Sequence, residues 1–393
     1  MADRAVQLTS AELKMLETLP ESEATSSVRA KGLPTRRVEQ WKWSDLRAAL
    51  KADRSPSLDF AATGPANPVA CEGAFEIVLR NGTASFDAPP DGIAVSRGLP
   101  EPALFAGAEV ASLATAAHTL TIDHHGGAPL IIRRLSDGEG WHTDRIRLRV
   151  PEGAEAVVIE THESNGAPFA NSLMEIDLAP GAVLHRLVLC DASAASVLVH
   201  TTLMSVGAGA TLRQASLSGG SHFTRHEARL TAAEGADIQL DGLYRLSEDR
   251  HNDFTSHVDL TAADAKVRQL YKGIVEDQAR GVFQGKFHVT RAAQHTDAQM
   301  GHHALLLSDR ATVNAKPELE IYADDVECAH GNTVGALDAE ALFYLRQRGL
   351  NEAAAQSLLI HAFAGEVIDG IENPMLQEAA RSVALDLLKE GAA

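Results

Sequence analysis

Short hydrophobic segments with a period of two residues fill the middle of the chain. RIRLRV (145–150), AVVIE (156–160), HRLVL (185–189) and SVLVH (196–200) show the pattern. Gly, Asn and Asp residues separate such segments, as they do at turns between strands. Alternation of apolar and polar positions is typical of strands that bury one face. The pattern predicts that residues from about 70 to 320 are nearly all strand.

A degenerate repeat runs through the same region. A Gly-Ala pair precedes a strand at Gly153, Gly181, Gly209 and Gly235, in steps of 28, 28 and 26 residues, with a weaker echo at 263–265. Repeats of this length in an all-β stretch indicate stacked coils, each of which buries its apolar face on its neighbours. A corner glycine gives the backbone the freedom to turn. The expected fold class is mainly β with a β-helix core, and the alternative left open is a jelly roll or sandwich.

The N-terminal region, to about residue 60, is expected to be helical. Thr9 and Glu12 have the spacing of a capping box, and leucines follow at helical intervals. A second helix is expected to carry Trp41, Leu46 and Leu50. A large aromatic side chain such as Trp41 usually packs a helix onto the body of a protein, so we expect it to be structural.

The C-terminal region is also expected to be helical. Asp338 and Asn351 are predicted to begin two helices, Gly349 ends the first, and the Asn373-Pro374 pair begins a third. Packing among these helices is expected to bury most of an apolar stripe formed by Leu358, Leu359, Ala362, Phe363, Val367 and Ile368. The predicted domains are an N-terminal helical region (1–65), the β-helix core (66–335) and a C-terminal helical domain (336–393).

Composition argues against several classes of protein. The 393 residues include 53 acidic and 35 basic ones, which gives a formal charge of −18. Nucleic acid is not an expected partner, because phosphate binding depends on clustered Lys and Arg. No stretch reaches the length of a membrane-spanning helix, and the charged N-terminus lacks the apolar region of a secretion signal. Cys71, Cys190 and Cys328 are too few and too scattered for a disulfide framework, so we expect a cytoplasmic protein.

Common catalytic and nucleotide-binding motifs are missing from the sequence. Without a G-x-x-x-x-G-K-[ST] loop, the chain alone is not expected to hydrolyse ATP. A nucleophilic triad stays open, because its members need not be close in sequence. The two histidines of HFTRH would lie about 13 Å apart along a strand and could not share a metal ion. We therefore expect solvated or core histidines, rather than zinc ligands, at His222, His226, His251, His257, His295, His302 and His303.

The run KPELEIYADDVECAHGNTVGALDAEALFYL (316–345) holds the best candidates for chemistry. It is predicted to be an extended edge segment, with Ile321 near its centre, that breaks at the Gly-Asn pair after His330. Strand residues two apart share a face, so Cys328 and His330 would lie about 6–7 Å apart on one side. Thiolate and imidazole are ligands of iron–sulfur clusters, but two ligands complete no site. The competing interpretation is a buried thiol beside a surface histidine.

The same run resembles the C-terminal signature of the SufB/SufD family, the scaffold proteins of the SUF iron–sulfur cluster assembly system, and resembles the SufD branch most. Asn332 stands where many relatives carry a small residue. The segments that carry the resemblance are KPELEIYADDVECAHGNTVG (316–335), ALFYLRQRGL (341–350), GKFHVTRAAQHTDAQMGHHALLLSD (285–309) and PTRRVEQWKWSDL (34–46).

The resemblance implies a right-handed parallel β-helix and a non-enzymatic scaffold. It implies a heterodimer with SufB through the β-helix end near 318–330, and contact of the ATPase SufC with the C-terminal helices. A transient iron–sulfur cluster would form at the SufB interface, with His330 as a metal ligand shared with SufB and Cys328 as its neighbour. The resemblance also allows reduced flavin in the complex and a homodimer of the chain alone.

Two alternatives stay open beside the SufD interpretation. The chain could be a SufB-like paralogue, although it lacks an N-terminal cysteine cluster and reads CAHGNTVG instead of a glutamate-rich C-E-H-E signature. Less favoured is a β-helix enzyme that acts on polysaccharide. Such an enzyme would require secretion and a cleft with paired carboxylates or calcium-binding acids.

Overall fold

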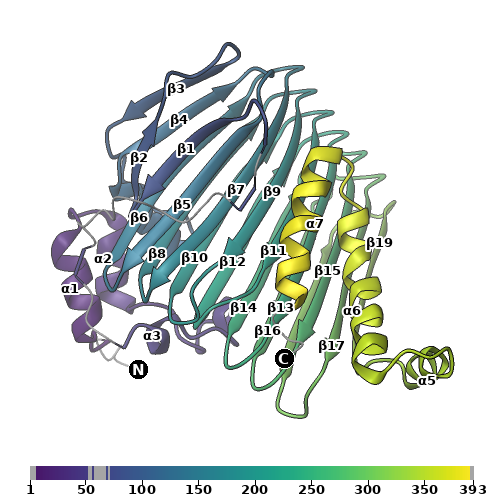
Figure 1. Cartoon of the computed structure of the whole chain (residues 1–393). Coiled ribbons are helices and arrows are strands. Elements are labelled where there is room, and N and C mark those ends of the chain that lie inside the picture. The colour runs from purple at the N-terminus through teal and green to yellow at the C-terminus, as the bar shows by residue number, and fades with distance from the viewer. Residues whose placement is uncertain (1–5, 52–54, 57–67, 70, 390–393) are drawn as a thin grey trace.

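A stack of parallel coils forms the body of the protein in a computed structural model that describes residues 6–51, 55–56, 68–69 and 71–389 (Figure 1). Strands alternate along the chain between a ten-stranded and a nine-stranded sheet. The ten-stranded sheet comprises, in spatial order, β2 (Thr83–Phe86), β1 (Phe75–Arg80), β5 (Leu130–Gly138), β7 (Glu155–Gly166), β9 (Val183–Asp191), β11 (Thr211–Ser218), β13 (Asp237–Leu246), β15 (Lys266–Val275), β17 (Asp297–Leu306) and β19 (Glu327–Gly335). The nine-stranded sheet comprises β3 (Ile93–Gly98), β4 (Thr119–His124), β6 (Trp141–Val150), β8 (Phe169–Leu178), β10 (Val197–Val206), β12 (Phe223–Ala232), β14 (His251–Leu260), β16 (Arg280–Val289) and β18 (Thr312–Ile321).

Pairing within both sheets is parallel along the stack, so the prediction of a mainly β protein built from stacked coils is confirmed and the antiparallel sandwich is wrong. The antiparallel strand pairs, β1–β2 and β3–β4, lie at the start of the stack. Each strand pairs in register with a strand of the next coil, as Val197 does with Phe223. Equivalent side chains of successive coils therefore stack into columns.

The repeat glycines occupy one corner of the coils. Gly153, Gly181, Gly209 and Gly235 all have φ between 62° and 68°, a conformation that glycine adopts without a steric cost. The N–H of each of the last three donates to a carbonyl of the following coil. The echo at 263–265 continues the corner, because Asp264 has φ 63° and makes the equivalent bond. The predicted role of the repeat is confirmed.

The space between the two sheets, the lumen, holds the main apolar core. In its apolar part, side chains of equivalent position stack from coil to coil. One such column comprises Leu148, Ile176, Met204, Leu230, Val258, Phe287 and Leu319. All but the last are buried, and Leu319 lies half-buried in the final coil. The column ends without a further coil to cover it.

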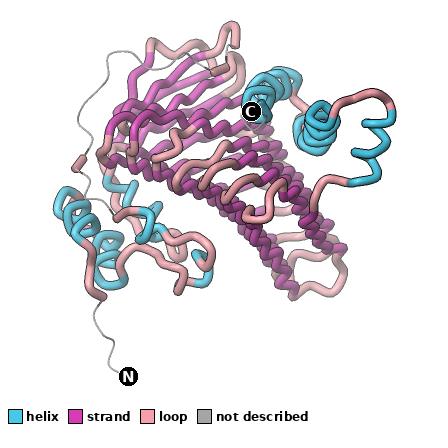
Figure 2. Tube along the Cα trace, turned by 60° about the horizontal axis from the view of Figure 1, so that its bottom comes forward, coloured by secondary structure: helices cyan, strands magenta, loops and turns pink. Residues whose placement is uncertain are grey.

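Helices cover the outer faces of the two sheets on opposite sides of the stack (Figure 2). The N-terminal helices pack on the nine-stranded sheet, with Trp41 buried and stacked 6.5 Å from the ring of Phe223. Two C-terminal helices pack on the outer face of the ten-stranded sheet. The helices are α1 (Ser10–Thr18), α2 (Glu23–Lys31), α3 (Leu46–Ala49), α4 (Glu109–Ser112), α5 (Ala339–Gln347), α6 (Glu352–Asp369) and α7 (Pro374–Lys389), with 3₁₀ turns η1 (Glu39–Trp41) and η2 (Leu113–Ala116).

Most predicted helix caps are confirmed. Thr9 and Glu12 form a capping box, and the side chains of Asp338, Asn351 and Asn373 accept backbone N–H groups at the starts of α5, α6 and α7. Residues 1–5, 52–54 and 57–65 of the predicted N-terminal helical region lie outside the described residues. None of the described helices is long and apolar enough to cross a membrane.

Three helical predictions need correction. No single helix carries Trp41 and Leu46, because the Asp45 side chain caps α3 and leaves Trp41 in the preceding 3₁₀ turn. The Ala-rich segment 109–116, expected to be strand, forms α4 and η2. The apolar stripe of α6 packs on the sheet as well as on α7, since Val367 lies in one cluster with Ile274 and Leu376, and its members Leu358 and Ala362 are exposed.

Glycines in the lumen make room for large side chains of adjacent coils. A Cβ atom at Gly273 would lie 2.1 Å from Cζ of Tyr244, and one at Gly285 would lie 2.3 Å from Sδ of Met300. Neither glycine has a positive φ, so space is what these positions require.

Gly273→Ala should destabilise the protein by about 1–3 kcal/mol, because buried Tyr244 has no free space into which it can move. Gly331→Ala is the control, since a Cβ there meets no atom within 4 Å. Urea denaturation of both variants measures the difference. Equal stability of the two variants would contradict the packing described here.

Candidate functional site

The last two strands form an uncovered end of the stack. β18 and β19 each end their sheet, and along 312–321 and 327–335 neither strand has a buried residue. The N–H of Thr312 donates to the carbonyl of Ala279, just before β16, and the N–H of Tyr322 donates to that of Val289, the last residue of β16. Successive residues of a strand direct their backbone N–H groups to opposite sides. The even-numbered residues of β18 therefore face β16, and the N–H groups of the odd-numbered residues point to the free edge. Pro317 falls in this set, as expected for a proline in an edge strand.

Cys328 and His330 lie on the lumen side of β19. They pair with Ala298 and Met300 of β17, both of which are buried in the lumen core. The predicted common face is therefore present. β19 continues through Gly331 to Gly335, so the predicted break after His330 is wrong, because pairing with β17 keeps the strand extended.

The two candidate side chains differ in environment. Cys328 is half-buried against the lumen core, and burial raises the pKa of its thiol, which favours the neutral form. His330 is exposed, and its ring makes no hydrogen bond or ion pair with the residues that the structure describes. The imidazole is available to a ligand, whereas the thiol needs a cation or metal nearby to become a thiolate.

The histidine clusters divide between surface and core. In HFTRH, His222 is exposed and His226 is buried, so the two do not share a site. His251 is buried with its Nε2 atom 3.0 Å from the Ser44 hydroxyl, and His302 is fully buried. His295 is exposed, at a corner of the stack with φ 59°. The prediction of solvated and core histidines is confirmed for these residues.

Sequence reasoning missed a polar cluster in the lumen. Donor atoms of Glu160, His162 and His200 lie within 4.8 Å of one another, and all three residues are buried. Glu160 and His162 share a face of β7 by their spacing, but His200 joins them from the opposite sheet. That contact depends on how the two sheets face each other, and no local pattern reveals it.

This cluster has the donor types of a metal site, but arginines already satisfy its carboxylate. Arg134 Nη1 lies 2.5 Å and Arg186 Nη2 lies 2.7 Å from the two oxygens of Glu160. Burial would raise the pKa of Glu160, yet these two guanidinium groups outweigh it and hold the pKa well below its usual range. A divalent ion would have to compete with two fixed cations in a dry interior, so we interpret the cluster as structural.

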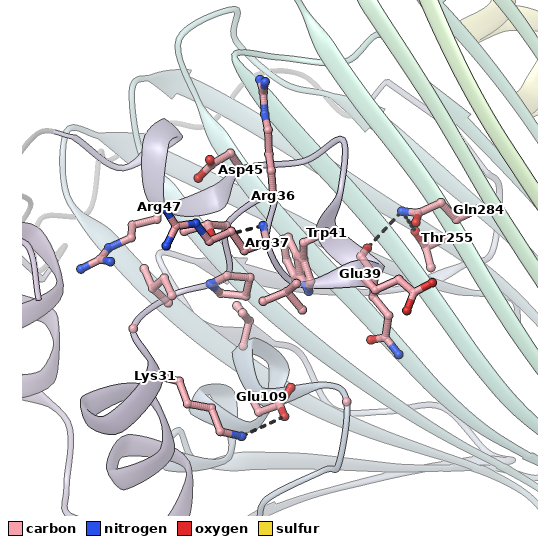
Figure 3. Close-up of a pocket in the computed structure, with 18 of the residues that line it drawn as sticks. Lys31, Arg36, Arg37, Glu39, Trp41, Asp45, Arg47, Glu109, Thr255 and Gln284 are labelled. Carbon is pink, nitrogen blue, oxygen red and sulfur yellow. Dashed lines mark hydrogen bonds and ion pairs between the residues drawn. The ribbon is translucent and has the colours of Figure 1, made fainter. Parts of the chain in front are cut away.

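A cleft of about 1310 Å³ separates the segment 31–47 from the outer face of the nine-stranded sheet (Figure 3). Lys316 of β18 pairs with Glu39 at 2.9 Å, and Gln284 Nε2 donates to the Gln40 carbonyl at 3.1 Å. Two sequence segments nearly 300 residues apart, RRVEQW and KPELEIY, therefore meet beside the open end. Most charged groups of the cleft have a partner within the protein. We therefore interpret the cleft as the contact between the N-terminal segment and the sheet rather than as a ligand site.

The fold and the exposed end together define a parallel β-solenoid that presents a thiol and an imidazole on its last strand, which is paired on one side only. The family described as "SUF system FeS cluster assembly, SufBD core domain" matches residues 133–363, which is more than half of the chain. The chain belongs to this family of iron–sulfur cluster assembly proteins.

Known relatives agree with this assignment. The chain is 30% identical to "Iron-sulfur cluster assembly protein SufD" of Escherichia coli over 88% of this chain and 87% of that protein. A SufBD family protein of Synechocystis is 38% identical over 54% of this chain and 47% of the relative. "Protein ABCI7, chloroplastic" of Arabidopsis thaliana is 32% identical over 62% and 52%, so these two matches span about half of each relative. The resemblance to SufD is confirmed, and a polysaccharide enzyme has no support.

Protonation of buried histidines should make the fold sensitive to acid. Burial lowers the pKa of His226 to about 3 and of His142, His251 and His302 to about 4. Below pH ~6.5 the unfolded chain binds protons at these residues and the folded chain does not. The free energy of unfolding should therefore fall as pH drops from about 6.5 to 4, by about 1.4 kcal/mol per pH unit for each histidine.

Urea midpoints measured between pH 4.5 and 7 test this dependence. His226→Phe should reduce the slope of the unfolding free energy against pH by the contribution of about one proton. Phenylalanine removes no hydrogen bond here, because neither ring nitrogen of His226 has a partner among the described residues. His222→Asn, at an exposed position of the same segment, is the control. A slope unchanged by His226→Phe would contradict a neutral buried imidazole.

Proposed function

We propose that this chain is a SufD-type scaffold subunit that assembles iron–sulfur clusters together with SufB and the ATPase SufC. The observation that carries the proposal is the uncovered end of the solenoid, where Cys328 and His330 share the lumen face of the last strand. A thiol and an imidazole supply two ligands at most, so a cluster there needs ligands from a second chain. A scaffold, in contrast to an enzyme, requires no complete site of its own.

SufB is the proposed partner at this end. The apolar column of the lumen stops at half-buried Leu319, and Ile321, Tyr322 and Val334 are 40%, 55% and 42% exposed. The free N–H and C=O groups of β18 and β19 form sheet edges that another chain can pair with. Covering the end near 318–330 with the equivalent end of a homologous solenoid would bury this apolar surface and satisfy both edges. In the absence of SufB, the same end would support a homodimer.

SufC is the proposed partner of the C-terminal helices. α5 extends away from the solenoid (Figure 1), and Phe343, Tyr344 and Leu358 are 64%, 57% and 49% exposed on α5 and α6. Exposed aromatic and aliphatic groups gathered on two adjoining helices are typical of a protein-binding surface.

The remaining features of the proposal follow from composition and family. The division into residues 1–65, 66–335 and 336–393 is proposed as a helical region, the solenoid and a SufC-binding region. All three cysteines are free thiols, which suits a reducing compartment, so we place the protein in the cytoplasm. We propose neither a nucleic acid nor a membrane as partner, and we propose reduced flavin as a cofactor of the assembled complex.

His330→Ala should lower cluster formation on the complex with SufB and SufC while folding and association stay intact. Alanine removes the imidazole nitrogen that would bind iron. Iron and sulfide content after anaerobic reconstitution measures the effect. Cys328→Ser, which replaces a thiol by a poorer iron ligand of similar size, is the companion variant, and we expect the histidine change to matter more. Wild-type cluster content in the His330→Ala complex would refute the assignment.

Ile321→Pro should weaken SufB binding several-fold without unfolding the solenoid. Ile321 lies at the end of β18 rather than near its centre as predicted, and its N–H points to the free edge. Proline removes that donor, a loss of about 0.5–1.5 kcal/mol, and leaves the pairing with β16 in place. Ile321→Ala is the control, because it keeps the N–H and truncates the side chain. Titration of each variant with SufB distinguishes them, and equal affinities would exclude edge pairing at this position.

A further inference from the structure

A chain of hydrogen bonds leads from the lumen core to the open end through three side chains. The Tyr244 hydroxyl lies 2.9 Å from Nε2 of His302, and Nδ1 of His302 lies 2.7 Å from Oδ1 of Asn332. Tyr244 and His302 are fully buried, whereas Asn332 is exposed on β19. The His302 ring also lies parallel to that of Phe283, with the centroids 4.9 Å apart. Packing and hydrogen bonds together fix the orientation of this imidazole.

The chemistry of these groups settles the direction of each hydrogen bond. An amide oxygen only accepts, so Nδ1–H of His302 donates to Asn332. Burial lowers the pKa of His302 to about 4, so the ring is neutral and its Nε2 atom accepts from the Tyr244 hydroxyl. Within this series of three side chains, the Tyr244 hydroxyl, both ring nitrogens of His302 and the Asn332 oxygen each have a hydrogen-bond partner, whereas the amide NH₂ of Asn332 has none in the described part of the protein. Among the described residues, no acceptor bonds to those two N–H groups.

Asn332 belongs to the same row of side chains as the candidate ligands. It pairs with His302 as His330 pairs with Met300 and Cys328 with Ala298, so all three face the lumen side of β19. The row spans about 13 Å, two steps of about 6–7 Å each. The NH₂ group of Asn332 is therefore held beside His330, at the end of the stack where no further coil follows.

We propose that Asn332 is a third functional residue of this end, whose amide N–H groups bind the anionic sulfur of the nascent cluster, with His302 and Tyr244 as positioning residues. The inference deepens the proposed function and rests on it. Sulfide and thiolate sulfurs accept hydrogen bonds, and such bonds tune the stability and reduction potential of iron–sulfur clusters. A neutral amide supplies this donor without a cation that would repel incoming iron. Because its oxygen is anchored by His302, the amide loses little side-chain freedom when it binds.

The alternative is that Asn332 serves only to satisfy the buried N–H of His302. Asn332→Asp separates the two roles, because it keeps an acceptor for His302 and replaces the NH₂ donors by a charged oxygen. Thr333→Val is the matched control. Thr333 is the next residue of the same strand, on its opposite face, and its hydroxyl lies 2.7 Å from Nδ1 of His303.

The experiment reconstitutes the complex with SufB and SufC anaerobically, using ferric iron, a thiol reductant and sulfide, and measures the rise of sulfide content with time and the reduction potential of the cluster. Asn332→Asp should lower the rate of cluster formation about tenfold, the size expected for losing one hydrogen bond to a charged group. Any cluster that forms should have a lower reduction potential, because a donor has been replaced by a negative charge. Thr333→Val should match the wild type in both measurements.

The positioning role has its own test. The double variant Tyr244→Phe/His302→Phe keeps the aromatic packing, leaves no buried hydroxyl without a partner, and frees the Asn332 amide to rotate. It should lower the potential in the same direction as Asn332→Asp, but by less, while thermal unfolding confirms a folded protein. An unchanged potential in this folded variant would overturn the positioning role.

The outcomes separate this inference from the proposed function. If His330→Ala lowers cluster content and Asn332→Asp does not, Asn332 is only an anchor for His302 and the inference fails alone. If neither variant changes cluster content or potential, the proposed site itself is wrong. If Thr333→Val changes the cluster as much as Asn332→Asp, the effect belongs to the strand rather than to the amide, and the inference is overturned.

Discussion

In-register hydrogen bonding between successive coils is the constraint on which the rest of the structure depends. Each coil satisfies its backbone groups only by pairing with the coil before it and the coil after it. A stack of this kind must have two ends. At the first end the sheets finish with the short strands β2 and β3, each paired antiparallel to its neighbour, whereas at the second end they finish with the longer strands β18 and β19, paired parallel on one side and facing no further coil on the other. The candidate site lies at the second end, where the outer edges of these two strands and the side chains of the last coil are available.

The same stacking gives the lumen two chemical zones. Apolar residues fill one part in columns, and a charge-balanced network around Glu160 occupies another. Charges in so dry an environment are tolerated only in pairs, and Arg134 and Arg186 supply the partners. A series of ring contacts runs from His226 through Phe254, Tyr271 and Phe283 to His302. The open end is therefore backed by a close-packed interior rather than by a mobile surface.

The helices leave that end free. N-terminal helices cover one sheet and C-terminal helices cover the other, so both outer faces are shielded while the axial end is not. The ion pair between Glu39 and Lys316 joins the N-terminal segment to the last strand of the nine-stranded sheet. Because the outer faces are covered by helices, a second solenoid would associate at the end formed by β18 and β19. A stack continued by that second chain would pair the free backbone groups of both strands.

The sequence by itself determined the local features of this protein. The period of two predicted the strands, the Gly-Ala repeat predicted stacked coils with a glycine corner, and polar residues such as Thr9 and Asp338 marked helix starts. It also put Cys328 and His330 on one face, because a strand's alternation is encoded in consecutive residues. Each of these features depends on neighbours within a few positions.

Only the tertiary structure decided how the coils meet. From β4 and β5 onward, partners in adjacent coils are 26 to 32 residues apart, and between β1 and β5 they are 55 apart, so the register cannot be read from the sequence. The assembly of Glu160, His162 and His200 and the bond from His302 to Asn332 both depend on that register. The tertiary structure also decided that β19 stays extended through Gly331, where local propensity predicted a break. Pairing with β17 outweighs the preference of a Gly-Asn pair for a turn.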